Sequence, residues 1–228
     1  MEAIILAGGL GTRLRSRVPN LPKAMAPIAG RPFLEYLLDQ LIEAGCARAI
    51  LSVGFMREAI VDAVGDQYRG LPVDYAIEES PLGTGGAIRL ALGRVREPAA
   101  LVLNGDTYLE ADYAAMSAFH AAEGRPMTMA VTHVDDTARF GGVLLSDRRV
   151  MGLVEKGRTG PGWINAGAYV MARDFPWPAG LGEQFSFETQ VMVPLLDRIL
   201  PAAFPCTGTF LDIGVPEDFD RAQELLTR

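Results

Sequence analysis

The sequence predicts an α/β fold, built on an open, mostly parallel, Rossmann-like sheet with helices on both faces. Residues 1–133 alternate between short apolar runs and segments with helical apolar spacing, joined by short turns. The apolar runs are nearly continuous, which is typical of parallel strands buried on both faces. Ligands of such sheets bind outside the carboxyl ends of the strands, so we expect the functional residues in the loops that follow them.

The first half of the chain supplies this alternation one element at a time. Glu2–Ala7 is an apolar run that ends in two glycines, as expected of a buried strand entering a loop. Phe33–Ala44 has helical apolar spacing, with Pro32 suited to a first turn and Gly45 to the position after the end. The remaining expected elements are a strand at Ala49–Val53, a helix at Met56–Val64, a strand at Val73–Ile77, a helix at Gly85–Leu92, a strand at Ala99–Leu103, a helix at Tyr113–Glu123 and a strand at Met127–His133.

The second half changes character and reads as a mixed region of short strands and two helices. The expected strands are Gly142–Ser146, Val150–Glu155 and Ala166–Ala172, with a hairpin turn at 146–149. The expected helices are Phe187–Leu200, with Ser186 as N-cap, and Pro216–Leu226, with proline at its first turn. Because no repeat or linker interrupts the pattern, we expect one domain spanning 1–228.

Composition excludes several classes of protein. Hydrophobic residues make up 49% and charged residues 21%, which excludes general disorder. The net charge of −7 disfavours a nucleic-acid partner. No apolar run reaches the ~18 residues of a membrane span, and the start lacks the basic segment of a signal peptide. Cys46 and Cys206 stand apart without metal-ligand spacing, so we expect both buried and reduced. These features predict a cytoplasmic protein.

The two histidines form no cluster with each other or with a nucleophile. We expect His120 on the exposed side of its helix and His133 near a strand end, and we assign neither a catalytic role. No G-x-S-x-G motif for a serine nucleophile is present. The chemistry is therefore expected to rest on other residue types.

A glycine-rich loop follows the first expected strand, in the segment LAGGLGTRL at 6–14, with Pro22-Lys23 downstream. Its glycines let the backbone approach an anion closely, Arg13 can grip phosphate oxygens, and Lys23 adds a point charge. A plain tight turn is the alternative, but it needs neither cation. The segment lacks both the G-x-x-x-x-G-K-[ST] phosphate loop and the G-x-G-x-x-G dinucleotide fingerprint, so NAD and FAD are disfavoured.

Two aspartates are candidate metal ligands. Asp106 follows a buried strand in NGDT, and Asp212 stands far downstream in LDIG. Mg²⁺ takes oxygen ligands, typically one or two carboxylates together with substrate phosphates. The alternative, in which Asp106 caps a turn and Asp212 is an ordinary loop residue, is equally good on the residues alone.

These motifs together resemble the sugar-1-phosphate nucleotidyltransferase family, which implies a glycosyltransferase-A-like α/β fold. The resemblance runs in order from LAGGLGTRL and PK through PLGTGGA at 81–87, NGD at 104–106, EK at 155–156, NAG at 165–167 and LDIGVPED at 211–218. PLGTGGAI, NGDT, FSFE and DIGVPED look most like the members that guanylylate a heptose 1-phosphate. By this resemblance, residues 1–133 are the nucleotide-binding half and 134–228 the sugar-phosphate-binding half.

The resemblance implies transfer of GMP from GTP to D-glycero-α-D-manno-heptose 1-phosphate, giving GDP-heptose and pyrophosphate for bacterial surface-polysaccharide synthesis. Alternatives within the family are uridylyl or guanylyl transfer to another sugar 1-phosphate, of N-acetylmuramate, mannose or glucose type. A catalytically inactive sugar-nucleotide sensor is a further alternative, against which the intact charged residues argue. Homodimers are the default expectation for such enzymes.

The same resemblance implies the residue roles. Arg13 would hold the departing pyrophosphate, Lys23 the triphosphate and Lys156 the incoming sugar phosphate, although a solvated lysine is the plain alternative for Lys156. Asp106 and Asp212 would hold Mg²⁺. Nucleotide contacts are expected from Leu6, Ala7, Gly8, Gly9, Gly11, Thr12, Glu79, Pro81, Gly83 and Thr84. Sugar contacts are expected from Asn104, Gly141, Glu155, Asn165 and Gly167.

Specificity is the part of the prediction that the motifs leave open. A carboxylate at Glu79 or Glu78 would accept the two donors on one edge of guanine, which favours GTP. The frequent family motif E-E-K-P is replaced here by Val154-Glu155-Lys156-Gly157. This departure bears on which sugar is bound rather than on the reaction.

Overall fold

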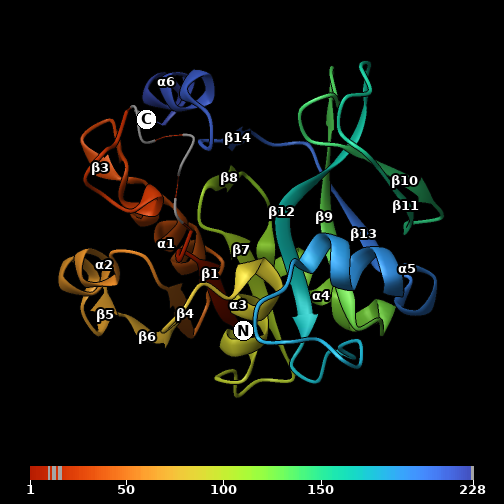
Figure 1. Ribbon diagram of the computed structural model, residues 1–228, viewed down its shortest axis with the longest axis horizontal. Helices are drawn as coiled ribbons and strands as arrows, with labels where there is room; N and C mark the ends of the chain where they lie inside the picture. Colours follow the sequence, from red (N-terminus) through yellow and green to blue (C-terminus); the bar gives the residue numbers. More distant parts are fainter. Residues whose placement is uncertain (10, 12–13, 15–16, 227–228) are drawn as a thin grey trace.

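A ten-stranded mixed sheet forms the centre of the molecule in the computed structural model, which describes residues 1–9, 11, 14 and 17–226 (Figure 1). Its strand order is β10-β11-β13-β9-β12-β7-β1-β4-β6-β5. The strands are β1 (Glu2–Leu6), β4 (Arg48–Val53), β5 (Gln67–Tyr68), β6 (Leu71–Ile77), β7 (Ala99–Asn104), β9 (Met127–Val134), β10 (Gly142–Ser146), β11 (Arg149–Val154), β12 (Gly162–Ala172) and β13 (Ala202–Cys206). Two small ladders pair β2 (Pro27–Ile28) with β3 (Arg31–Pro32), and β8 (Thr107–Leu109) with β14 (Phe210–Asp212).

The sheet confirms the predicted fold class. Strands β6, β4, β1 and β7 are mutually parallel neighbours, and β9 and β13 form a second parallel pair. Strand β12 runs antiparallel between β7 and β9 and joins the two parallel groups. Strands from both halves of the chain therefore form one sheet.

Helices cover both faces of this sheet, as the apolar runs predicted. The helical segments are η2 (Lys23–Met25), α1 (Phe33–Glu43), α2 (Arg57–Val64), α3 (Gly83–Leu92), α4 (Tyr113–Glu123), η3 (Glu188–Met192), α5 (Val193–Ile199) and α6 (Pro216–Leu225). Alternate residues of β1 face opposite ways: Ala3 and Ile5 join a core with α1 and α4, whereas Ile4 joins a core with α3 and α5. All three are fully buried.

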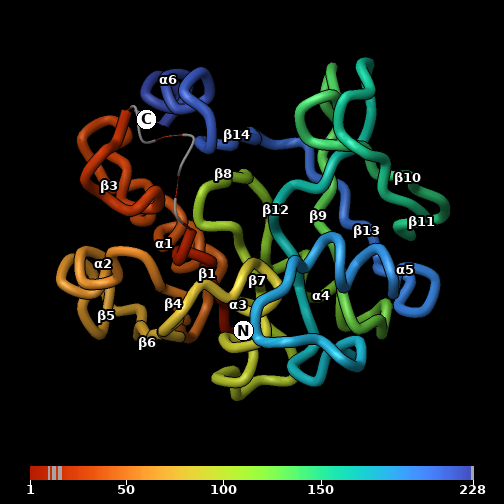
Figure 2. Tube along the Cα trace, viewed as in Figure 1, coloured from red at the N-terminus to blue at the C-terminus, as the bar shows by residue number. Residues whose placement is uncertain are grey.

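The last helix packs beside the start of the chain. The side chain of Gln223 accepts the Ala29 amide at 2.8 Å and donates to the Pro27 carbonyl at 2.8 Å. Figure 2 shows α6, in blue, next to the red segment that holds β2 and β3. The C-terminal helix therefore helps to fix the β2–β3 turn, within the connection between β1 and α1.

Two local predictions are corrected by the structure. The helix predicted over Phe187–Leu200 is a π-helical turn, η3, followed by α5, although Ser186 does cap it, with Oγ accepting the Thr189 amide at 3.2 Å. His120 was expected to be exposed but is buried, and its Nδ1 lies 3.0 Å from Oγ1 of Thr128. The small residues on the other faces of α4 made its buried side hard to identify. Cys46 and Cys206 are buried and unpaired, as expected.

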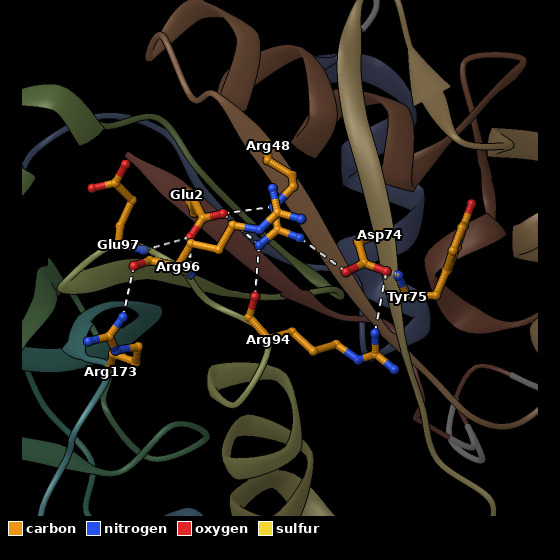
Figure 3. A network of polar contacts seen from close by, with 8 residues as sticks. All are labelled: Glu2, Arg48, Asp74, Tyr75, Arg94, Arg96, Glu97 and Arg173. Carbon is orange, nitrogen blue, oxygen red and sulfur yellow. Dashed lines mark hydrogen bonds and ion pairs between the residues drawn. The ribbon is translucent and has the colours of Figure 1, made fainter.

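A buried polar network fastens the amino ends of β1 and β4, away from the loops expected to bind ligand (Figure 3). Arg48 donates to Glu2 at 2.7 Å and to the Arg94 carbonyl at 2.7 Å. The second Glu2 oxygen accepts the amides of Arg96 at 2.6 Å and Glu97 at 3.0 Å. Burial acts to raise the pKa of Glu2, but these amides and Arg48 outweigh it and hold that pKa below its usual range.

No helix in the described part of the chain is long and apolar enough to cross a membrane.

Candidate active site

A pocket of about 590 Å³ lies at the carboxyl ends of the central parallel strands. Its walls come from the loops after β1, β4, β6 and β7, which confirms that the predicted loops converge. Such a position is typical of ligand sites in open α/β sheets. The lining residues are Leu6, Ala7, Gly8, Gly9, Lys23, Ala24, Gly54, Phe55, Glu78, Glu79, Ser80, Pro81, Gly83, Thr84, Ala87, Asn104, Gly105, Asp106 and Gln184.

The glycine-rich loop enters this pocket directly from β1. Gly8 has no room for a side chain, because a Cβ there would lie 2.4 Å from Oε1 of Glu78. Gly11 has a φ of +57° and lies beside the aliphatic part of Lys23, where a Cβ would be 3.0 Å from the Lys23 Cβ. Thr12 and Arg13 lie outside the described residues.

Lys23 and Asp106 form the charged centre of the pocket. Lys23 Nζ lies 2.5 Å from Oδ2 of Asp106, and the lysine side chain is only 11% exposed. The η2 turn holds Lys23 in place, because the next two residues, Ala24 and Met25, are buried in the core. The ammonium also lies 2.6 Å from the position that a Cβ on Gly214 would occupy. Lys23 therefore contacts both the loop after β7 and the turn after β14.

Asp212 comes next to Asp106 through the ladder between β8 and β14. In this ladder Asp212 is paired with Thr107, and the Ile213 amide donates to the Asp106 carbonyl at 3.0 Å. One Asp212 oxygen accepts the Gly214 amide at 2.8 Å, and the other lies 3.4 Å from the guanidinium of Arg139. Asp106 and Asp212, which are distant in the sequence, therefore lie in backbone segments that pair with each other.

This pair fits a hard divalent cation. No group of three or more His, Cys, Asp or Glu residues suited to a metal occurs among the described residues. Magnesium does not need such a group, since it is commonly held by one or two carboxylates together with substrate phosphates. Asp106 and Asp212 offer oxygen donors only, and Lys23 already holds positive charge against Asp106. The structure therefore brings the two predicted ligands into adjoining segments, each with its carboxylate beside a basic side chain.

The two glutamates at the end of β6 differ in their surroundings. Glu78 is held in place: its carboxylate accepts the Ser52 hydroxyl at 3.2 Å and the Leu82 amide at 3.2 Å. Glu79 has a side chain that is 81% exposed and lies 3.3 Å from Arg57. Both line the pocket, next to Pro81. Glu79 is thus the more available acceptor, and Glu78 the more rigid one.

The glycines that begin α3 serve packing as well as ligand approach. Gly83 has a φ of +69°, and a Cβ there would lie 2.7 Å from the Phe185 carbonyl. A Cβ on Gly86 would lie 2.4 Å from the Glu183 carbonyl. Thr84 Oγ1 accepts the Phe187 amide at 3.1 Å. The segment before η3 therefore packs tightly on the start of α3.

This packing brings Gln184 into the pocket, a residue that the sequence analysis missed. The only available signal was the adjacent FSFE motif, which begins 79 residues after Asp106, the nearest preceding pocket residue in the chain. Phe55 was missed as well; it follows β4 and lines the same pocket. Each belongs to a loop whose position depends on tertiary packing.

The predicted sugar-binding residues divide between two places. Asn104 lines the main pocket, and Gly167 approaches it closely, since a Cβ on Gly167 would lie 2.8 Å from Nδ2 of Asn104. Asn165 accepts the Gly167 amide at 3.0 Å and donates to the Tyr169 hydroxyl at 2.6 Å. Burial raises the pKa of Tyr169 to about 12, so this hydroxyl stays protonated. Gly141 and Asn165 both line a smaller hollow of about 30 Å³.

Glu155 and Lys156 lie outside the main pocket. Both are exposed, in the turn that follows β11. Lys156 is nevertheless beside Gly141, where a Cβ would be 3.6 Å from the Lys156 Cγ. The structure thus gathers the glycine-rich loop, Lys23 and Asp106 in the main pocket, and places Lys156 outside it on the arm formed by the turn after β11.

Comparisons with known proteins give a family model and several relatives that match nearly the whole chain. The family model described as "Nucleotidyl transferase" matches residues 2–228. The D-glycero-alpha-D-manno-heptose 1-phosphate guanylyltransferase of Aneurinibacillus thermoaerophilus is 39% identical over 226 residues, covering 99% of this chain and 98% of the relative. The protein of the same name from Campylobacter jejuni is 38% identical, covering 96% and 97%. The crystal structure of HddC from Yersinia pseudotuberculosis complexed with GMP-PN is similar with a TM-score of 0.84 at 38% identity, covering 99% of both chains.

Proposed function

This chain belongs to the nucleotidyl transferase family, and on that basis we propose that it transfers GMP from GTP to D-glycero-α-D-manno-heptose 1-phosphate. The products are a GDP-linked heptose and pyrophosphate. Two relatives that match the chain over nearly their whole length are guanylyltransferases for this sugar phosphate. The similar HddC structure contains GMP-PN. The chain is accordingly a sugar-1-phosphate guanylyltransferase.

The observation that carries the proposal within the molecule is the ion pair of Lys23 and Asp106 in the pocket, next to the segment that bears Asp212 and Gly214. A positive side chain at 2.5 Å from one carboxylate, beside a second carboxylate, is suited to neutralising a triphosphate and a cation together. A simple binding protein for a neutral sugar would not need this arrangement.

The reaction requires an oxygen of the sugar phosphate to attack the α-phosphorus of GTP while pyrophosphate leaves. Both partners are anions, so positioning and charge neutralisation supply most of the catalysis. In our proposal the glycine-rich loop binds the nucleotide through its backbone, and Lys23 neutralises charge near the reacting phosphorus. Arg13 would hold the pyrophosphate, and Lys156 would meet the incoming sugar phosphate when its arm approaches the pocket.

We assign Asp106 and Asp212 to a bound Mg²⁺. The ion supplies charge neutralisation between the phosphates and the carboxylates. The chain's own part would be to present the two carboxylates from the segments that the β8–β14 ladder pairs. Chelation should therefore stop turnover and leave the fold intact, as circular dichroism would report.

For substrate recognition we assign the base to the loop that holds Glu78, Glu79, Pro81, Gly83 and Thr84. Glu79 would accept the donors on the edge of guanine. The sugar would contact Asn104, Gly141, Glu155, Asn165 and Gly167. We also propose that the enzyme acts in the cytoplasm as a homodimer and supplies the synthesis of a bacterial surface polysaccharide.

The test is release of pyrophosphate from GTP, UTP, dTTP, CTP or ATP with a panel of sugar 1-phosphates that includes the manno-heptose. We expect release with GTP and the heptose phosphate, and a loss of about 10²-fold or more in Asp106→Asn. Release with UTP or with another sugar phosphate would contradict the proposed substrates, whereas the proposed nucleotidyl transfer would stand. Nucleotide binding without release from any pair would instead indicate a sensor.

A further inference from the structure

A second cavity, of about 610 Å³, lies between α6 and the ends of β9 and β12. We call it the α6 groove; its lining residues come from 132–135, 139–140, 163, 206–210 and 218–225. It shares no lining residue with the pocket described above, yet the two have nearly equal volume. In Figure 1 α6 lies at the upper left, and β14 runs from it toward the upper ends of β9 and β12. Both volumes fall within the ~300–1,000 Å³ typical of small-molecule sites.

The groove holds a positive charge that the protein does not itself neutralise. Arg221 is exposed on α6 and has no ion-pair or hydrogen-bond partner within the described part of the chain. The other arginine of the groove, Arg139, is already paired with Asp218 and lies 3.4 Å from Asp212. Arg221 is therefore the guanidinium that an entering anion would meet, and its planar fork matches a phosphate.

Aromatic rings and oxygen acceptors line the rest of the groove. Trp163 meets His133 edge-on at 5.5 Å, and Phe210 meets Phe140 edge-on at 5.4 Å. Asp135 adds an exposed carboxylate. Aromatic faces pack against the C–H faces of a sugar ring, whereas carboxylates accept from its hydroxyls. An anion without hydroxyls would be repelled by the Asp135 carboxylate and could donate no hydrogen bond to it.

We propose that the α6 groove binds a phosphorylated sugar, with its phosphate on Arg221 and its ring among Trp163, Phe210 and Asp135. This site is additional to the active site and does not depend on the reaction proposed above. Its effect on turnover does rest on that reaction. Arg139 lines the groove and contacts Asp212, so an occupant that draws Arg139 toward its phosphate changes the surroundings of a proposed metal ligand.

The test uses Trp163 as the reporter. The chain has two tryptophans, so Trp177→Phe leaves Trp163 alone. Mannose 1-phosphate is titrated without nucleotide or magnesium, beside mannose and inorganic phosphate as the two fragments. We expect a saturable change of fluorescence with mannose 1-phosphate. Each fragment should bind at least about tenfold more weakly than mannose 1-phosphate, the loss expected for removing one charge-assisted contact. Equilibrium dialysis on the unmodified chain gives the same comparison if Trp177→Phe fails to fold.

Two variants decide where the ligand binds. Arg221→Gln should abolish the response, whereas Arg198→Gln, an exposed arginine of α5 outside the groove, should keep it. Lys156→Gln should also keep it, because that lysine belongs to the proposed active site. A response that survives Arg221→Gln and is lost in Lys156→Gln would place the ligand at the active site and overturn the proposal. No saturable response, or equal affinity for inorganic phosphate, would overturn it too. Pyrophosphate release in the unliganded enzyme reports separately on the proposed reaction.

Discussion

Lys23 and Asp106 meet at 2.5 Å across the mouth of the main pocket, joining the loop after β1 to the loop after β7. The lysine is nearly buried, at 11% exposure, and the aspartate is about one-third exposed, at 35%. The pair therefore keeps the Lys23 ammonium at a fixed position beside the Asp106 carboxylate, which still faces the pocket. Catalysis by charge neutralisation needs such an arrangement to exist before the substrate arrives.

Removing the ammonium should impair catalysis more than folding. We expect Lys23→Met to lower kcat by about 10²–10³-fold, the loss typical of one preorganised charge contact. Steady-state pyrophosphate release measures it, with thermal unfolding to show that the fold persists. Arg17→Gln is the matched control, because Arg17 forms an exposed ion pair with Asp220. An unchanged kcat in Lys23→Met would contradict the assigned role.

Gly86 tests whether the start of α3 is shaped by packing. Helix propensity alone predicts that Gly86→Ala stabilises the protein by about 1 kcal/mol. The structure predicts the opposite sign, because the new Cβ would lie 2.4 Å from the Glu183 carbonyl. We expect a loss of about 1–3 kcal/mol and a raised KM for GTP, since Gln184 would move with its neighbour. Gly182→Ala is the control: a Cβ added there would meet no atom within 4 Å, so this variant should leave the KM for GTP unchanged.

Glu2 is expected to be the most sensitive acid in the network of Figure 3. Glu2→Gln leaves the buried Arg48 without its main partner, which should cost about 3–5 kcal/mol in urea unfolding. Glu58→Gln should change stability by less than about 0.5 kcal/mol, because that carboxylate is 74% exposed. Equal effects of the two substitutions would contradict the importance of burial.

The lowered pKa of Glu2 gives this contribution a direction with pH. The contribution of Glu2 to stability is fully present above its unfolded-state pKa of about 4.5. It is lost as the pH falls through the lower pKa of the folded state. The stability difference between the parent and Glu2→Gln should therefore narrow as the pH falls below 4.5.

His120 should make stability fall with falling pH, as Glu2 does, but here because the folded state favours the neutral form of the side chain. Burial lowers the pKa of His120 below 6.5, so the folded state prefers the neutral ring. Stability is full above pH 6.5 and falls as the unfolded chain takes up its proton below that value. The slope is at most about 1.4 kcal/mol per pH unit. His120→Gln should flatten the unfolding free energy between pH 5 and 6.5; an unchanged slope would sink the argument.

The sequence was sufficient for the regular parts of the fold. Helix Tyr113–Glu123 and strand Gly142–Ser146 were predicted with their observed bounds, because local spacing and turn residues define them. Strand β12 is longer than the predicted Ala166–Ala172, since the register shift between Asn165 and Tyr169 interrupts its pattern. Strand β13 went unpredicted: it is short and contains Pro205, which sequence rules place away from interior strands.

The site was predictable in its residue types more than in its geometry. The glycines after β1, Lys23 and Asp106 predict a phosphate site by their chemistry, and the structure places all of them in connections that follow β1 or β7. The position of Asp212 could not be derived from spacing, because it depends on the β8–β14 ladder between distant segments. Gln184 was missed for the same reason, since it enters the pocket through packing on α3.

The late position of β13 in the chain constrains the order of assembly. The hairpin of β10 and β11 precedes β13 in the sequence. In the described residues it pairs with the rest of the sheet through β13, where Arg149 is paired with Ala202. Asp212 follows on β14, so a chain still being synthesised can complete neither the hairpin's attachment nor the carboxylate pair. An incomplete chain would therefore lack the β14 segment that bears Asp212, and the sheet would be complete only after residues 202–212 have been made.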